Sequence, residues 1–84
     1  MIKKAYEKYK KKYGNNAQMT KAVEEMAELI MAITKYQNGL ADGQNIIEEI
    51  ADVEIMTAQL KMMFNCSDKV EIWKDIKIGK MLRS

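Results

Sequence analysis

The chain has 84 residues, of which 48% are hydrophobic, and it contains no proline, no histidine and one cysteine. Its formal charge of +2 is too small to indicate nucleic-acid binding, and no apolar run approaches the ~20 residues that a membrane span needs. The single Cys66 excludes an internal disulfide, and the N-terminus lacks an apolar signal segment. These features indicate one domain, residues 1–84, that is soluble, makes no membrane contact and lies in a reducing cytoplasm.

The composition, rich in Met, Ile and Ala and poor in Gly, favours helix throughout the chain. Hydrophobic periodicity predicts four helices, over about residues 2–13, 17–37, 44–64 and 68–82. Gly14 is expected to end the first helix, and Asn15 or Asn16 to cap the second. Ser67 is expected to cap the fourth.

The apolar residues of the second and third helices predict which faces are buried. On the second helix the predicted core stripe consists of Met19, Val23, Met26, Ile30 and Ile33. The third helix is apolar nearly all round and is therefore expected to be buried on several sides. Because so short a chain buries only about 60–65% of its unfolded surface, we expect an antiparallel bundle of about four helices, completed by homo-oligomerisation.

Charge is distributed unevenly along the chain. Residues 1–21 carry seven Lys and one Glu, residues 22–54 carry eight acids and Lys35, and residues 55–84 carry six bases and three acids. An acidic centre between basic flanks suits a polyphosphate with bound metal, because the metal prefers carboxylates and the phosphates prefer Lys. Charge complementarity between packed helices explains the same distribution equally well.

Two acidic runs dominate this centre. They are Glu24-Glu25-Met26-Ala27-Glu28 and Glu48-Glu49-Ile50-Ala51-Asp52. Carboxylates three residues apart share one face of a helix, so the two runs could offer four hard oxygen ligands of the kind that Mg²⁺ prefers. Solvated acidic pairs are common on helices. Glu49 and Asp52, however, lie in line with Met56, Leu60 and Met63, so this acidic face is expected to point inward.

The two runs, in this order and about twenty residues apart, resemble the EExxE and ExxD motifs of the MazG-like, all-α nucleoside triphosphate pyrophosphohydrolases. Residues 18–30, 51–56 and 77–82 are also similar to segments of that family, and the resemblance covers about residues 14–82. It implies Mg²⁺-dependent hydrolysis, with Mn²⁺ as a substitute, of an NTP or dNTP to the monophosphate and pyrophosphate, as in nucleotide-pool house-cleaning. It further implies a homodimer or homotetramer.

The resemblance assigns roles to individual residues. The metal ligands that it implies are Glu25, Glu28, Glu49 and Asp52. With no histidine present, Glu28 is also the expected proton acceptor in catalysis. The candidate substrate-binding residues are Gln18, Lys35, Lys77 and Lys80. Each of these four also fits an ordinary surface position.

Two other functions remain open from the sequence. The first is a catalytically inactive helical module that binds a partner or senses nucleotide. The second, less well supported, is nucleic-acid binding through the Lys-rich first helix, which would weaken steeply with salt. Tyrosines interleave with the lysines of that helix, and we expect them to pack against the second helix instead.

Overall fold

The computed structural model describes all residues 1–84 and contains helices and no strands. The four helices are α1 (Ile2–Tyr13), α2 (Asn15–Gln37), α3 (Gln44–Met63) and α4 (Ser67–Arg83). The predicted all-α class and the number of helices are therefore confirmed, and every boundary lies within two residues of its expected place. No helix is long and apolar enough to cross a membrane.

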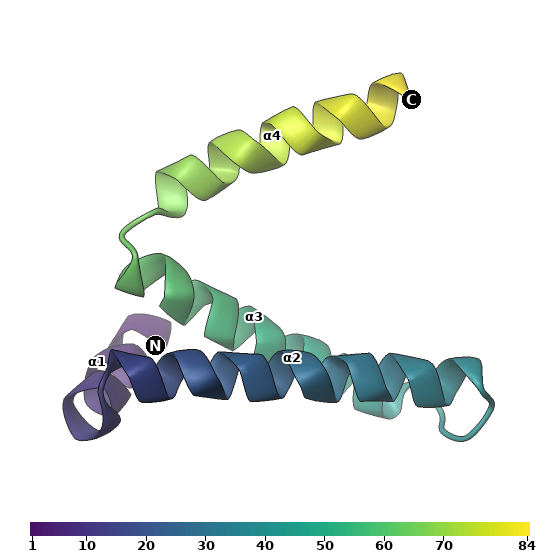
Figure 1. Cartoon of the computed structure of the whole chain (residues 1–84), viewed down its shortest axis with the longest axis horizontal. Coiled ribbons are helices and arrows are strands. Elements are labelled where there is room, and N and C mark those ends of the chain that lie inside the picture. Colours follow the sequence, from purple (N-terminus) through teal and green to yellow (C-terminus); the bar gives the residue numbers. More distant parts are fainter.

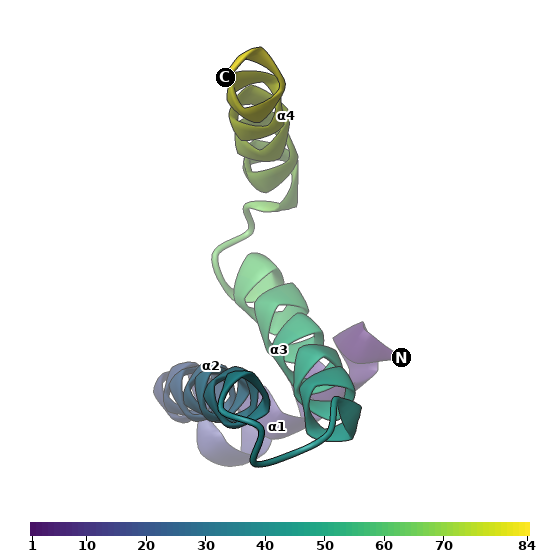
Figure 2. The same ribbon diagram turned by 90° about the vertical axis from the view of Figure 1, so that its right-hand side faces the viewer.

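The central unit is an antiparallel hairpin of α2 and α3, joined by a turn over residues 38–43 (Figure 1). The short helix α1 packs across one end of the hairpin and contacts both of its helices. By contrast, α4 contacts only α3 and extends away from the hairpin, as the end-on view shows (Figure 2). Three helices thus pack together, and the fourth projects from them.

The helix ends differ from the capping predicted from sequence. Gly14, at φ +85° and ψ 163°, joins α1 to α2, so Asn15 is already the first helical residue of α2. The Asn15 side chain instead accepts a hydrogen bond of 2.8 Å from the buried Tyr6 hydroxyl, which ties α1 to α2. Ser67 is likewise the first residue of α4, and Cys66 precedes it without a side-chain cap. The expected Asn and Ser caps are therefore wrong.

The core is small and partly polar. Seven residues are buried: Tyr6, Gln18, Ala22, Glu25, Ala32, Met56 and Gln59. On α2 the buried face is thus the line through Ala22, Glu25 and Ala32, whose alanines let α3 approach closely. The predicted core stripe is wrong, because Val23 and Ile30 are 66% and 65% exposed. The expected burial of α3 on several sides is also not seen in the single chain, where Ile47, Ile50 and Ile55 are exposed.

The conformation of Gly14 provides a test of the α1–α2 junction. A Cβ at Gly14 would meet no atom within 4 Å, but its φ of +85° disfavours any L side chain. We expect Gly14→Ala to lower the free energy of unfolding by about 1–3 kcal/mol. Gly43→Ala is the matched control, because Gly43 has φ −78° and equally open space. Urea unfolding followed by circular dichroism should show little change for the control; equal losses for both variants would contradict this account.

Candidate metal centre

Three carboxylates from the two hairpin helices converge at the middle of the structure. Glu25 comes from α2, and Glu49 and Asp52 come from successive turns of α3. One oxygen of each lies within 4.8 Å of the others. The predicted inward orientation of the acidic face of α3 is therefore confirmed for Glu49 and Asp52. It results from the close packing of α2 on α3.

Two of these carboxylates each have a buried oxygen without a hydrogen-bond partner. Glu25 is 7% exposed, and its Oε2 is among the buried unpaired atoms, as is Oε2 of the half-buried Glu49. A buried, unpaired carboxylate oxygen is unfavourable because it has lost water without gaining a donor. Both residues belong to the converging group, so a cation bound there would offset the charge of both carboxylates.

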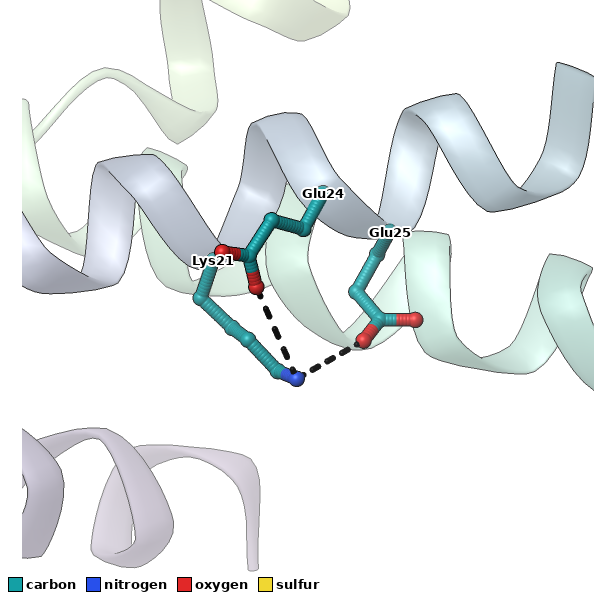
Figure 3. A network of polar contacts seen from close by, with 3 residues as sticks. All are labelled: Lys21, Glu24 and Glu25. Atoms are coloured by element: carbon teal, nitrogen blue, oxygen red, sulfur yellow. Dashed lines mark ion pairs between the residues drawn. The ribbon is translucent and has the colours of Figure 1, made fainter.

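Lys21 neutralises part of this charge. Its Nζ lies 3.1 Å from Oε1 of Glu25 and 4.0 Å from Oε2 of Glu24 (Figure 3). The hydrogen bond to Glu25 and the charge of Glu25 raise the pKa of Lys21, so this ammonium stays protonated. The second oxygen of Glu25 points away from the lysine (Figure 3), which leaves it free for a ligand.

Glu49 is affected both by loss of hydration and by the other acids of the cluster. Loss of hydration raises the pKa of its carboxyl above the ordinary value of 4.5, and the negative charges of Glu28, Asp52 and Glu25 raise it further. Like charges held together in this way shift a titration upward unless a cation offsets them. The raised pKa of Glu49 thus results first from its loss of hydration and then from the negative charges around it.

Glu28 lies beside this group, outside the set of three converging oxygens. It lines a hollow of about 230 Å³ together with Met31, Ala32, Lys35, Asn45 and Glu49. Lys35 is thus adjacent to the acids, as a phosphate-binding role requires. The structure brings Glu28 and Lys35 to the same place as Glu49.

The other predicted substrate residues lie elsewhere. Gln18 is buried on the inner face of α2 and borders a second hollow, of about 250 Å³, that also includes Tyr9, Tyr13 and Lys21. The expected packing of the tyrosines on the second helix is confirmed for Tyr6, which is buried and bonded to Asn15, whereas Tyr9 and Tyr13 border α2 at this hollow and remain 44% and 55% exposed. Lys77 and Lys80 lie on the projecting helix α4, which makes no contact with α2.

The donor set fits Mg²⁺. All the converging atoms are hard carboxylate oxygens, and no sulfur or imidazole ligand is present. Glu25, Glu49 and Asp52 would hold the ion, and Glu28 lies near enough to Glu49 to influence its titration.

Two residues of the site were not identified from sequence. Lys21 lies four positions before Glu25, a spacing that by itself predicts an ion pair on a helix. Asn45, in contrast, gives no sequence signal, because its place beside Glu28 depends on the turn that brings α3 back along α2. The pairing of the two helices therefore determines most of the site.

Comparison with known proteins adds no assignment. No protein-family model, no curated protein and no solved structure matches the chain. The candidate function therefore depends on the chemistry of the carboxylate site.

Binding of Mg²⁺ should stabilise the folded chain. At a concentration about 100 times the dissociation constant, a site present only in the folded state adds about 2.7 kcal/mol, or roughly 10–20 °C in Tm for a domain of this size. Glu25→Ala should remove this response. Glu54→Ala, at an exposed acid of α3, is the control and should keep it. Thermal unfolding at matched ionic strength measures the effect, and an equal response in both variants would argue against the site.

The raised pKa of Glu49 predicts how stability without metal depends on pH. A raised pKa in the folded state means that protonated Glu49 favours folding, and this contribution is lost as the pH rises through the folded pKa. Glu49→Gln, which imitates the protonated acid, should therefore be more stable than the parent at pH 7 in EDTA. The difference should vanish below about pH 4, where Glu49 is protonated in both the folded and unfolded states. A variant less stable than the parent at pH 7 would contradict the prediction that ionised Glu49 destabilises the folded chain.

Proposed function

We propose that the protein hydrolyses a nucleoside triphosphate, NTP or dNTP, to the monophosphate and pyrophosphate with Mg²⁺ as cofactor. The observation that carries the proposal is the convergence of Glu25, Glu49 and Asp52, with two buried oxygens that lack a partner. The order and spacing of the acidic motifs, which resemble those of MazG-like pyrophosphohydrolases, support the same reaction. When bound, Mg²⁺ would activate water and offset charge on the phosphate oxygens.

The residues around the carboxylates suit the remaining tasks. Water attacks the α-phosphorus, and the bond to the oxygen that bridges the α and β phosphates breaks, so pyrophosphate leaves. Glu28 is the proposed acceptor of the water proton, since it borders the hollow next to Glu49. Lys35 in the same hollow would contact the phosphates of the substrate.

Gln18, Lys77 and Lys80 remain proposed substrate contacts, and they differ in how near they lie to the carboxylates. Gln18 borders the hollow that contains Lys21, the lysine paired with Glu25, so it lies along the same inner face as the carboxylates. Lys77 and Lys80 are on α4 and do not approach the carboxylates of their own chain. A phosphate-binding role for these two lysines requires either movement of α4 or contribution from another copy.

A helical interaction module without catalysis is the second candidate. It is favoured by the extent of exposed apolar surface, including Trp73 at 59% and Leu82 at 82%. Such a module would not need the unpaired carboxylate oxygens between α2 and α3. Turnover therefore separates the two candidates.

Pyrophosphate release from a panel of NTPs and dNTPs with Mg²⁺ or Mn²⁺ tests the activity. We expect turnover of at least one nucleotide. Glu25→Ala and Asp52→Ala should each lower kcat by roughly 100-fold or more, because each removes a ligand that stabilises charge in the transition state. Both variants should remain folded, since removing one carboxylate relieves repulsion.

Glu54→Ala is the matched control and should retain parental activity, since its exposed side chain is not one of the converging ligands. If no nucleotide is hydrolysed by the parent, and if Glu25→Ala leaves its response to metal unchanged, the enzyme proposal is refuted. The helical interaction module would then be the better account of the chain.

A further inference from the structure

The helix α4 lacks burial within its own chain. None of its residues is buried, and it contacts only α3. Apart from the half-buried Val70, its large apolar side chains are exposed, between 42% and 82%; they are Ile72, Trp73, Ile76, Ile78, Met81 and Leu82. A helix of this length is marginal in water unless an apolar face is packed. The helix therefore needs a surface that the single chain does not give it.

A second uncovered surface lies on α2. We call it the outer α2 flank, and it consists of Val23, Met26, Ile30 and Ile33. These side chains are 66%, 36%, 65% and 40% exposed, and their spacing of three or four residues forms a continuous stripe about 15 Å long. The flank is rotated by about 110° around α2 from the face that carries Glu25. It is therefore separate from the carboxylate site.

The accessible surface of the chain indicates how much area is left without packing contacts. The accessible surface is 6815 Å², whereas a compact monomer of this mass exposes about 5,100 Å², an excess of about 1,700 Å². The radius of gyration is 15.3 Å, against about 12 Å for a compact domain of this length. Obligate homodimers bury about 1,000–2,500 Å² per chain, so the excess corresponds to one such interface.

We infer that α4 of one copy packs on the outer α2 flank of a second copy, and that the two copies exchange this contact in a closed, two-fold dimer. The same chain carries both uncovered surfaces, so a two-fold axis covers both at once and closes the assembly. The length of α4, about 25 Å, exceeds that of the flank, so one helix can cover the whole stripe. This inference is independent of the proposed catalytic activity.

Light scattering after size-exclusion chromatography tests the assembly. The parent should have twice the mass of one chain. Ile30→Lys on the flank and Ile76→Lys on α4 should each weaken dimerisation by roughly 100-fold or more, because a two-fold interface contains each substitution twice. Ile2→Lys, at a 40% exposed apolar residue of α1, is the control and should remain dimeric. A parent that is monomeric at every concentration, or a control that dissociates equally, would overturn the inference.

Cross-linking identifies the contact and avoids the risk that a buried lysine unfolds the chain. In a Cys66→Ser background, Ile30→Cys and Ile76→Cys proteins are purified separately, mixed and oxidised. A mixed disulfide that forms faster than either self-disulfide supports packing of α4 on α2 between copies. Faster self-linking of Ile30→Cys would show an α2–α2 interface instead. Rapid intramolecular closure of the double-cysteine variant, without links between copies, would show that α4 folds back on its own chain; either result refutes the exchange.

Discussion

The close packing of α2 on α3 determines both the fold and the candidate site. Ala22 and Ala32 allow the two helices to approach, and Glu25 lies on the same face between them. The interaction that forms the hairpin therefore also forces Glu25, Glu49 and Asp52 together. In most small domains such a position would hold an apolar residue. Here the centre of the contact carries negative charge, so packing and electrostatics oppose one another within one interface.

Lys21 only partly relieves this opposition. It pairs with one oxygen of Glu25, but its side chain is 54% exposed, and an ion pair with so exposed a partner is screened by water. The unpaired oxygens of Glu25 and Glu49 remain. A divalent cation would bind both oxygens. Its attraction for the three carboxylates would outweigh their mutual repulsion. This is why an inward-facing acidic cluster whose one ion pair is with the exposed Lys21 supports metal binding better than a purely structural role.

Local sequence signals predicted the helices well and the buried faces poorly. The four helices follow from composition and periodicity, with Gly14 at the first break. The acidic face of α3 was also predicted, because Glu49 and Asp52 continue the line of Met56. On α2 the most hydrophobic stripe predicts the core, but the hairpin buries the line of Ala22, Glu25 and Ala32 instead. Periodicity identifies an apolar face; it does not distinguish burial against the same chain from burial against another.

The same distinction explains why apolar side chains are exposed on more than one face of the chain. A single hairpin face needs only one stripe on each helix, yet Ile30 on α2, Ile50 on α3 and Trp73 on α4 all point away from it. With so few buried residues, the isolated chain has little apolar burial to oppose the repulsion at its centre. A partner copy and a cation would each bind only the folded hairpin, on separate faces of α2, so each would add to its stability by mass action. In a chain this short, charge at the core makes such added stability more important than it would be in a larger domain.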